Sequence, residues 1–590
     1  MISKPAMSCS RHVTAPSCPA FRKGYRRYEA VSLPSRWQQR AAATAVPDRW
    51  PRSCLKYFAA RQELGDRRTC CAWRDAEGVT MTDVLKLAEI AGAPATSGHA
   101  LHYAPAVKDD IADQPSPIAA TTKLLFVTSE MGDFIKAGGL GEVSTALPRQ
   151  LRKFCEVRVL LPGFRQVRKA KPAMDVVRQM PRVASLPPWS LGRFTMSDGL
   201  IVYTVLCDEL YDREGSPYGP FGGGDFGDND IRFGRLSLAA AEIAAGEADP
   251  NWKPDVVHVN DWPSALAPGY MRWKGLETPS ILTIHNLAYQ GLYHPQRMRL
   301  LGIPDQAFNI NGSEFHGKIS FLKSGIFYGS HVTTVSETYA NEITTSEHGC
   351  GLDGLLKTRM GEGRLTGIVN GIDDSWNALI EGGPSGDQII RQWKRRNAAD
   401  IRRTFDLPDS RGPLFSIVSR LVHQKGIDLS LEAAETIVEQ GGQLVVTGRG
   451  EPRIEEAVEK LARRYPRAVA ARIGFDDGEA RRLFAASDFL LMPSRFEPCG
   501  LSQMYAQRSG ALPIAYRTGG LVDTIEDGLS GFLFSSLTGA GLTGAVARAL
   551  EAFRSKRAFR QMRDHAMAKR FDWRRPSFRY ADVYARALAA

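Results

Sequence analysis

Cysteine is scarce in most of the chain, which argues against a disulfide framework and against a paired metal site. Nine cysteines occur in 590 residues, and five of them fall within the first 71. The remaining four, Cys155, Cys207, Cys350 and Cys499, are widely scattered. Disulfide-rich domains and structural zinc sites need cysteines at short, paired spacings. We therefore expect a protein of a reducing compartment.

Long hydrophobic runs are also missing. A helix that crosses a membrane needs at least about 18 predominantly apolar residues in a row, and no run approaches that length. Hydrophobic residues make up 43% of the chain and charged residues 24%, which is ordinary for a globular protein. A membrane partner is therefore not expected.

Acidic residues are rare at the front of the chain. Residues 1–75 contain 15 Lys and Arg but only five Asp and Glu, a net charge of +10, so the other 515 residues carry only about +2 of the total of +12. The basic character thus belongs to the front segment and gives little support for nucleic-acid binding by the body. No nucleic-acid partner is predicted.

Residues 1–121 are interpreted as an N-terminal extension. They mix Arg, Ser, Ala and Pro without sustained periodicity, apart from one short helical pattern at 81–92, and they end in a polar linker at 108–123. An unstructured extension, or upstream sequence translated from a misplaced start, explains this composition. The alternative is an organelle transit peptide, which is rich in Arg and Ser and poor in acids. The first interpretation predicts a cytoplasmic protein, and the second predicts a plastid one.

From residue 122 onward, short apolar runs alternate with amphipathic segments such as 230–247. Buried parallel strands are predicted at 157–162, 255–260, 280–285 and 331–336, and then at 413–420, 443–448, 468–474, 488–493 and 511–516. Strand–helix alternation gives doubly wound sheets, so the predicted fold class is α/β with two Rossmann-like domains facing a central cleft. The predicted boundaries are 122–375 for the first domain and 376–575 for the second. Residues 576–590 are expected to form a C-terminal helix that packs back on the first domain.

Two similar Gly-Gly turns follow apolar strands in the two halves. The first is IKAGGLGEV at 135–143 and the second is YRTGGLVDTI at 516–525. Glycine lets a backbone approach a ligand closely, and a helix start offers free N–H donors that suit phosphate. Tight strand–helix connections selected for packing are the alternative explanation. Neither turn matches GxxxxGK[ST] or GxGxxG, so a nicotinamide-dependent dehydrogenase is not favoured.

A second anion signal lies in SRLVHQKGID, at 419–428. It places Arg420 at the end of a predicted strand and Lys425 five residues later. Open α/β sheets bind ligands at the carboxyl ends of their strands, and Arg and Lys are the usual phosphate partners. Two solvated surface cations are the alternative.

The third signal is the turn PSRFEPCGLSQMYA, at 493–506. Glu497 follows a predicted strand, and Cys499 and Gly500 precede a predicted helix. A carboxylate in such a turn can accept hydrogen bonds from sugar hydroxyls. It can equally pair with the dipole of the following helix.

Several multi-residue motifs occur together in one order. They are KAGGLGEV, HVNDWPSALAPGYM, TIHNLAYQG, FNINGSEFHGKISFLKSGIFY, VNGIDDSWN, SRLVHQKGID, PSRFEPCGLSQMY and RTGGLVDT. In this set the chain resembles the bacterial glycogen synthases and plant starch synthases. The resemblance covers roughly residues 122–590 and does not extend to 1–120.

The resemblance implies a GT-B fold, with two Rossmann-like domains closing over a nucleotide sugar. It implies transfer of glucose from ADP-glucose to the non-reducing 4-hydroxyl of an α-1,4-glucan such as glycogen, with retention of configuration. It also implies that neither a cofactor nor a metal is needed, because Lys and Arg neutralise the leaving group.

The resemblance also assigns expected roles to individual residues. Those expected to bind ADP-glucose are Lys136, Gly138, Gly139, Arg420, Lys425, Glu497, Cys499, Gly500, Thr518, Gly519 and Gly520. Those expected to act in catalysis are Lys136, Asp228, Asn260, Arg420, Lys425 and Glu497. Tyr211 and Asn286 are expected on the acceptor side.

One position departs from the family pattern. The family usually has His-Asp-Trp where this chain has Asn260-Asp261-Trp262. Asn can donate or accept a hydrogen bond to the donor sugar but cannot carry a positive charge. The nearby His258 is interpreted as a strand residue and not as a replacement. Tyr505 occupies the place of a second acid found in other retaining GT-B enzymes, as it does in the resembled subfamily.

The acidic stretch GGGDFGDNDIRF also permits a metal interpretation, through Asp225, Asp228 and Asp230. The twelve-residue calcium-loop pattern and its terminal Glu are absent, so loop acids near a helix start are favoured.

Two other functions remain open at this point. One is a GT-B transferase with another donor, such as a UDP-sugar. The other is a catalytically impaired glucan-binding relative, which only Asn260 favours. The retention of Lys136, Arg420, Lys425 and Glu497 argues against it.

Overall fold

A computed structural model describes residues 115–221, 223–377, 387–474 and 476–590. All of these residues belong to one compact unit, Lys108–Ala590. The expectations for residues 1–114, including the helix at 81–92, lie outside the described residues. No helix in the described part of the chain has both the length and the apolar character that crossing a membrane requires.

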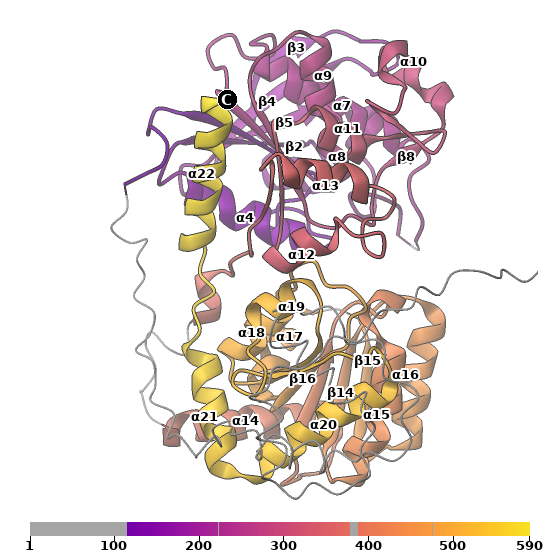
Figure 1. Ribbon diagram of the computed structural model, residues 1–590, viewed down its shortest axis with the longest axis vertical. Coiled ribbons are helices and arrows are strands. Elements are labelled where there is room, and N and C mark those ends of the chain that lie inside the picture. Colours follow the sequence, from indigo (N-terminus) through magenta and orange to yellow (C-terminus); the bar gives the residue numbers. More distant parts are fainter. Residues whose placement is uncertain (1–114, 222, 378–386, 475) are drawn as a thin grey trace, which may run out of the picture. The chain divides into compact units, whose positions relative to one another are not determined.

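The N-terminal lobe is built on a sheet whose described strands have the order β12-β11-β7-β6-β1-β2-β5-β4-β3 (Figure 1). Their bounds are β1 (Lys123–Val127), β2 (Glu156–Pro162), β3 (Asp175–Met180), β4 (Trp189–Thr195), β5 (Ile201–Leu206), β6 (Val256–Asn260), β7 (Ser280–Ile284), β11 (His331–Thr334) and β12 (Leu365–Gly367). Neighbours from β12 to β5 are parallel, and β4 and β3 continue the sheet antiparallel. The central strands are buried along their whole length, which is why they are continuous apolar runs in the sequence.

Helices cover this sheet on both sides. They are α4 (Gly139–Leu151), α5 (Arg165–Ala170), α6 (Asp208–Tyr211), α7 (Asn229–Ala244), α8 (Asp261–Ser264), α9 (Ala267–Trp273), α10 (Met298–Leu301), α11 (Phe321–Tyr328), α12 (Glu337–Glu342) and α13 (Asp353–Gly361). A small antiparallel sheet joins β8 (Leu292–Tyr293), β10 (Lys318–Ser320) and β9 (Glu314–Phe315). Short 3-10 turns occur at Pro295–Arg297, Asp305–Ala307 and Asp374–Asn377.

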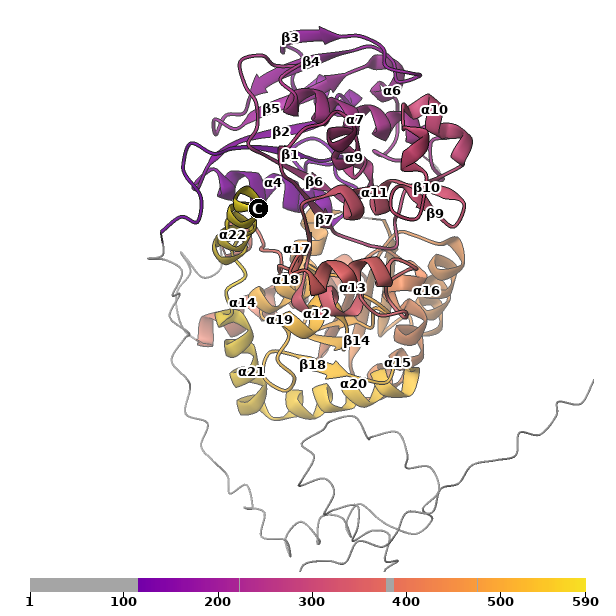
Figure 2. The same cartoon turned by 45° about the horizontal axis from the view of Figure 1, so that its top comes forward.

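The C-terminal lobe, coloured orange to yellow in Figure 2, has a parallel sheet with the order β15-β14-β13-β16-β17-β18 among its described strands. The strands are β13 (Leu414–Val418), β14 (Gln443–Gly448), β15 (Val469–Ile473), β16 (Phe489–Met492), β17 (Leu512–Tyr516) and β18 (Phe532–Phe534). Its helices are α14 (Asp387–Thr404), α15 (Ile427–Glu439), α16 (Pro452–Arg464), α17 (Asp477–Ala486), α18 (Ser502–Arg508), α19 (Gly519–Thr524), α20 (Gly539–Arg554) and α21 (Lys556–Ala568), with a 3-10 turn at His423–Lys425.

Both lobes have the doubly wound strand order, in which the chain starts in the middle and builds outward in two directions. The order reverses between β13 and β16 in one lobe and between β1 and β6 in the other. Ligands of such sheets bind at the carboxyl ends of the strands, at the point of reversal. The topology therefore selects four loops, those that follow β1, β6, β13 and β16, before any side chain is considered.

The predicted fold class is confirmed, and each predicted strand falls on an observed one. The antiparallel edge formed by β3 and β4 was not predicted. Four of the six positions of β3 are exposed and only Met180 is buried, so this strand lacks the apolar run of a buried parallel strand. The expected join at 376–411 contains a long helix, α14, which packs against α17 of the C-terminal lobe.

The last helix, α22 (Arg574–Ala589), returns to the N-terminal lobe and lies beside α4 (Figures 1 and 2). Tyr580 and Tyr584 are fully buried in the same hydrophobic core as β1 and β6. The hydroxyl of Tyr584 lies 2.8 Å from Nδ1 of His258 on β6, and the Nε2 of that histidine lies 2.6 Å from the hydroxyl of Thr283. His258 is thus a buried strand residue that ties β6 to the end of the chain.

We expect His258 to make the protein acid-sensitive. Burial lowers the pKa of His258 to about 3, against about 6.5 in an unfolded chain. Between these values the unfolded chain binds the extra proton, so stability falls as pH falls from about 6.5, by up to about 1.4 kcal/mol per pH unit. Urea unfolding of His258→Gln should show lower stability than wild type at pH 7.5 but a flatter loss between pH 6.5 and 5. If His258→Gln lost unfolding stability as steeply as wild type between pH 6.5 and 5, His258 would not be the source of the acid sensitivity.

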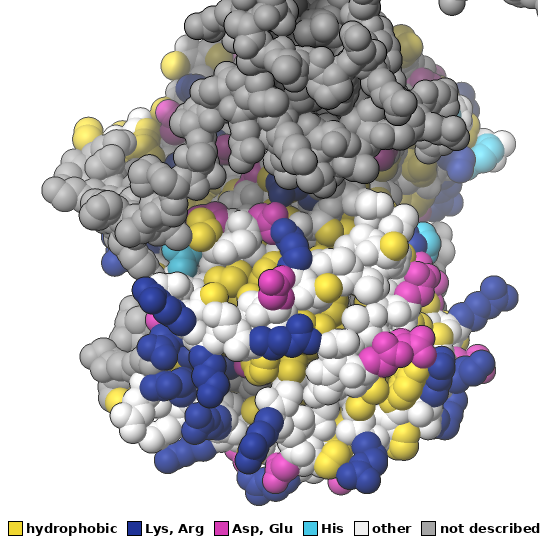
Figure 3. Space-filling model, turned by 60° about the horizontal axis from the view of Figure 1, so that its bottom comes forward, with side chains coloured by type: hydrophobic (Ala, Val, Ile, Leu, Met, Phe, Trp, Pro, Cys, Tyr) yellow, Lys and Arg dark blue, Asp and Glu magenta, His cyan; other side chains and the backbone are white. Residues whose placement is uncertain are grey.

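Lysine and arginine side chains are spread over the face of the C-terminal lobe that Figure 3 presents, with fewer Asp and Glu among them. Exposed cations on α14 include Arg395 and Arg396, and those at the junction of α20 and α21 include Arg554, Lys556 and Arg557. These cations lie on surface helices and not in the loops at the carboxyl ends of the strands. They are therefore a separate feature from the cations of the site described next.

Candidate functional site

The loops after β13 and β16 place the predicted residues Arg420, Lys425 and Glu497 at the strand-order reversal of the C-terminal lobe. Lys425 donates a hydrogen bond of 2.6 Å from Nζ to Oε2 of Glu497, and Ser494 donates to the same oxygen at 2.8 Å. Glu497 is only 5% exposed. A cation and an anion are thus held against each other in a largely dry setting, where their charges act strongly.

Arg420 lies at the same edge of the sheet but is exposed. Its Nη1 is 3.5 Å from the hydroxyl of Tyr289, which belongs to the N-terminal lobe, and its Nη2 is 3.4 Å from Oε1 of Gln424. Both contacts are long, so the guanidinium keeps donors that can turn to an incoming anion.

The second Gly-Gly turn interlocks with the turn that carries Glu497. The N–H of Gly520 donates to the carbonyl of Glu497 at 3.0 Å. A Cβ on Gly519 would lie 2.0 Å from that carbonyl oxygen, and one on Gly520 would lie 2.2 Å from the carbonyl oxygen of Cys499. Glycine is therefore required here by the close approach of two backbones. The predicted residues Glu497, Cys499, Gly519 and Gly520 are brought together.

A carboxylate from the N-terminal lobe already occupies the donors of this second turn. Oε1 of Glu342, at the end of α12, accepts from the N–H of Gly519 at 2.9 Å and from the hydroxyl of Thr518 at 3.1 Å. In the described state these two donors bind an anion that the protein itself supplies. The predicted contact of Thr518 and Gly519 with ADP-glucose stays a prediction.

Cys499 and Gly500 complete the turn. Gly500 has a φ of +70°, which favours glycine. Burial raises the pKa of the Cys499 thiol to about 12, so this sulfur is a neutral packing group and not a nucleophile.

The loop after β1 places Lys136 at the strand-order reversal of the N-terminal lobe. Its Nζ donates to Oε1 of Glu142 at 2.8 Å and approaches Asp477, on α17 of the C-terminal lobe, at 3.2 Å. Burial opposes the charged form, but hydrogen bonds and charges from Glu142 and Asp477 outweigh it and raise the pKa of Lys136 above its usual 10.5. Lys136 is therefore a fixed positive charge that reaches both lobes.

The glycines beside Lys136 differ in what they are needed for. Gly138 begins the turn into α4 in an extended conformation, and a Cβ there would meet nothing within 4 Å, while one on Gly139 would only touch Leu501 at 3.9 Å. Open space beside Gly138 and Gly139 suits the approach of a ligand. Gly141, which the sequence interpretation did not single out, is the crowded one, because its Cβ would lie 2.9 Å from Cγ of Lys136.

Asn260 follows β6 at the same reversal point and is 1% exposed. Its Nδ2 donates to the carbonyl of Val127 on β1 at 3.0 Å, and its Oδ1 accepts from Nε2 of His285 at 3.0 Å. Both ends of the amide are therefore used to tie three strands together. Burial lowers the pKa of His285 to about 3, so the imidazole is neutral.

Asp261 holds the turn that carries Asn286. It has a φ of +53°, and its Oδ1 accepts from the N–H groups of His285 at 2.7 Å and Asn286 at 3.3 Å. Burial raises the pKa of Asp261 to about 7 despite these bonds. Asn286 is half-buried, and its own Oδ1 accepts from the N–H of Ala288. The loop after β7 is thereby held against α8.

Asp228 and Tyr211 lie near the start of α7. Both oxygens of Asp228 accept from the guanidinium of Arg213, at 2.7 and 2.6 Å. Burial acts the other way, but these bonds lower the pKa of Asp228 below its usual 3.8, so the carboxylate is ionised. Tyr211 is fully buried and donates to the carbonyl of Arg232 at 2.6 Å. Tyr211 therefore lies in the interior of the N-terminal lobe and not on its surface.

The acidic stretch around Asp228 does not form a metal-binding cluster within the described residues. Asp230 pairs with Arg297, and Asp228 pairs with Arg213. No group of three or more His, Cys, Asp or Glu that could hold a metal ion occurs among residues 115–221, 223–377, 387–474 and 476–590.

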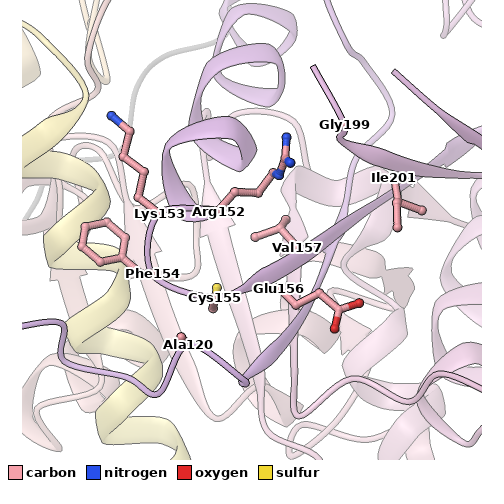
Figure 4. Close-up of a pocket in the computed structure, with 9 residues that line it drawn as sticks. All are labelled: Ala120, Arg152, Lys153, Phe154, Cys155, Glu156, Val157, Gly199 and Ile201. Atoms are coloured by element: carbon pink, nitrogen blue, oxygen red, sulfur yellow. The ribbon is translucent and has the colours of Figure 1, made fainter. Parts of the chain in front are cut away.

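One hollow of the N-terminal lobe lies away from these loops. It has a volume of about 400 Å³ at the amino ends of β2 and β5, where Arg152 and Lys153 end the connection from α4 and Glu156 begins β2 (Figure 4). Figure 4 shows the side chains of Lys153 and Glu156 pointing apart on the two sides of the hollow. A smaller cavity of about 110 Å³ has Glu142, the partner of Lys136, in its wall. The smaller cavity, and not the larger hollow, adjoins the site.

Sequence reasoning missed several carboxylates that organise the site. Glu130, Glu142, Glu342 and Asp477 each bond a predicted residue or its turn. Glu130 carried a usable signal, because it follows β1 at the strand-order reversal. Glu342 and Asp477 are on surface helices far away in the sequence, and only the folded contacts reveal them.

Two doubly wound lobes with cations at the carboxyl ends of their strands define a class of protein, the GT-B glycosyltransferases. A starch synthase catalytic domain model matches residues 123–358, and a model of group 1 glycosyl transferases matches 412–552. A glycogen synthase of Pseudomonas syringae pv. syringae is 53% identical over 464 residues, which is 78% of this chain and 96% of that protein. The chain belongs to the glycogen synthase and starch synthase family.

Further relatives agree with this assignment. Glycogen synthase 1 of Bradyrhizobium diazoefficiens is 53% identical over 465 residues, 78% of this chain and all of that protein. The catalytic domain of starch synthase IV from Arabidopsis thaliana, solved with ADP and acarbose, has a TM-score of 0.69 at 28% identity. That match covers 80% of this chain and 100% of the solved chain.

Proposed function

We propose that this chain is a glycogen synthase, which transfers glucose from ADP-glucose to the non-reducing 4-hydroxyl of an α-1,4-glucan with retention of configuration. The observation that carries the proposal is the convergence of Arg420, Lys425 and Glu497 at the strand-order reversal of the C-terminal lobe. Relatives 53% identical are glycogen synthases, and the starch synthase IV domain was solved with a nucleoside diphosphate and an oligosaccharide analogue. Both support a nucleotide-sugar donor and a glucan acceptor.

The leaving group sets the main chemical demand. Cleavage of the bond between C1 of glucose and the phosphate oxygen leaves negative charge on ADP. Preorganised cations aimed at that charge are usually the largest catalytic contribution. Arg420 and Lys425 would neutralise it from the C-terminal lobe, and Lys136 from the N-terminal lobe. Lys136 and Lys425 are already fixed by carboxylates, so little reorganisation accompanies the reaction.

Retention is proposed to arise by front-face attack. The 4-hydroxyl of the acceptor enters beside the leaving phosphate, its oxygen forms the new bond to C1, and its proton passes to the departing phosphate oxygen. Glu497 is bonded to Lys425 and Ser494, and Cys499 is a buried neutral thiol, so neither is proposed as a covalent nucleophile.

The remaining predicted residues are proposed to shape the two substrate sites. Glu497, with the backbone at Cys499 and Gly500, is proposed to receive the glucosyl hydroxyls. Thr518, Gly519 and Gly520 are proposed to support that turn beside the diphosphate. Asn286 and Asp228 are proposed to form the acceptor side, with the buried Tyr211 supporting it from the interior, and Asn260 is proposed to stand where the family histidine acts. The proposed domains are 122–375 and 376–575, with the helix at 576–590 completing the first.

We expect the protein to incorporate radiolabelled glucose into glycogen from ADP-glucose, and at least about tenfold less efficiently from UDP-glucose, a difference of about 1.4 kcal/mol in transition-state binding. The measurement is kcat/KM for each donor at fixed glycogen. Preference for UDP-glucose would favour the other-donor transferase. No ADP release above a Lys136→Ala background would favour the impaired relative.

A cytoplasmic location is proposed, since the relatives at 53% identity are bacterial. Mass spectrometry of the native N-terminus tests the alternative, because removal of a plastid transit peptide would give a mature protein that starts within the first 121 residues.

A further inference from the structure

A buried carboxylate lies directly behind the Lys136 loop. Glu130, three residues after the end of β1, is 3% exposed. Its Oε2 accepts from the N–H of Ala137 at 2.7 Å and from the N–H of Gly138 at 3.1 Å. Its Oε1 accepts from the hydroxyl of Tyr218 at 2.5 Å. Both oxygens are therefore used, and two of the three donors belong to the two residues that follow Lys136.

The backbone of Glu130 is itself tied to the helix that the loop enters, through the hydroxyls of Thr128 and Ser144. The N–H of Glu130 donates to Oγ1 of Thr128 at 3.2 Å, and that hydroxyl donates to the carbonyl of Glu130 at 2.9 Å. The same Thr128 oxygen is 2.8 Å from the hydroxyl of Ser144, in the second turn of α4. Hydrogen bonds thus link the end of β1, Glu130, the Lys136 loop and α4 to one another.

Burying a charge is costly, so the position of Glu130 requires an explanation. A carboxylate removed from water is tolerated only when donors replace the lost hydration. Hydrogen bonds from N–H groups to a charged oxygen are shorter and stronger than neutral ones, so they fix the loop backbone more firmly than a neutral partner would. The same bonds occupy the amides of Ala137 and Gly138, so in the described state these two N–H groups hold the loop and are not offered to an anion.

Tyr218 connects this loop to the acceptor side. Tyr218 is half-buried, and burial of its hydroxyl, followed by the charge of Glu130, raises its pKa well above 10, so it stays a donor. Its backbone carbonyl accepts from Nδ2 of Asn229 at 2.8 Å, and Asn229 follows Asp228 at the start of α7. One continuous set of contacts therefore joins the Lys136 loop to Asp228.

We propose that Glu130 is a positioning residue for glucosyl transfer, which holds the ammonium of Lys136 where the departing diphosphate develops its charge, and that Tyr218 keeps Glu130 in place. This role rests on the proposed function. Glu130 touches neither substrate; it acts through Lys136.

The test is a double-mutant cycle between positions 130 and 136, with kcat and KM for ADP-glucose as readouts. If Glu130 acts through Lys136, Glu130→Ala lowers kcat by about 100-fold in the wild-type background but by less than about threefold in Lys136→Ala. Glu130→Gln keeps an oxygen for the two amides and should recover kcat to within about tenfold of wild type. Tyr218→Phe should lower kcat less than Glu130→Ala does, because the loop bonds remain.

Glu242→Gln is the matched control. Glu242 is another buried carboxylate of the N-terminal lobe, 2% exposed and bonded to Trp189 and Arg235. Its replacement should lower the urea midpoint, and its effect on kcat should be the same with or without Lys136. If Glu130→Ala does not fold, Glu130→Gln and Tyr218→Phe take its place in the double-mutant cycle with Lys136→Ala.

The positioning role would be overturned if the Glu130 variants lowered kcat by the same factor in the wild-type and Lys136→Ala backgrounds. A wild-type kcat in Glu130→Ala would overturn it as well. An inactive wild-type protein would instead overturn the proposed function, so the two failures are distinguishable.

Discussion

Lys136→Ala is expected to lower kcat for glucosyl transfer by about 10²–10³-fold, because it removes one preorganised cation from the leaving diphosphate. That loss corresponds to about 2.7–4 kcal/mol of transition-state stabilisation. The fold should be retained, since the lysine side chain lies in the loop after β1 and is 26% exposed. Radiolabel incorporation into glycogen at saturating ADP-glucose measures the effect.

Lys460→Ala is the matched control for this prediction. Lys460 is an exposed lysine in the last turns of α16, outside the four loops of the site. Its replacement should leave kcat within about twofold of wild type, as is usual for surface changes of less than about 0.5 kcal/mol. A Lys136→Ala protein with nearly wild-type kcat would mean that the first lobe contributes no charge to the reaction.

Lys425→Met is expected to damage both activity and stability. The single change leaves the carboxylate of Glu497 without its cation, and the two side chains are only 17% and 7% exposed. Breaking such a pair costs about 3 kcal/mol of unfolding free energy, because one buried charge stays uncompensated. Loss of the cation should also lower kcat by about 100-fold or more.

The double variant Lys425→Met with Glu497→Gln separates these two effects. Removing both charges should recover most of the stability, since a neutral pair of similar volume carries no uncompensated charge. It should not recover activity, because the leaving diphosphate would still lack its cation. Urea unfolding and glucose incorporation on the same samples measure both. Recovery of kcat in the double variant would show that Lys425 serves the fold and not the chemistry.

The sequence predicted the parts of the fold whose signal is local. Apolar runs of the length of a strand at 157–162, 443–448 and 488–493 are buried on both faces, and that requirement alone makes them visible. The edge strand β3 was missed because exposure on both faces leaves no periodic apolar signal. The same reasoning places Arg420 and Glu497 in the loops that follow β13 and β16, and their roles in the reaction stay predictions.

The partners of the site residues could not be predicted in this way. Lys136 is paired with Asp477, 341 residues later, and the amide of Gly519 with Glu342, 177 residues earlier. Carboxylates on helix surfaces are common and usually solvated, so nothing local distinguishes these two. Motif knowledge located the cations, and only the folded contacts identify the anions that hold them.

The crossing of α22 has a consequence for synthesis on the ribosome. Tyr580 and Tyr584 belong to the core that β1 and β6 begin more than 300 residues earlier. The first lobe emerges early from the exit tunnel, yet one side of its core stays uncovered until α22 has been translated. A nascent chain must therefore keep that lobe incomplete while the whole second lobe is translated. Chains truncated just before residue 574 should for this reason fail to fold the N-terminal lobe, although the truncation removes none of its strands.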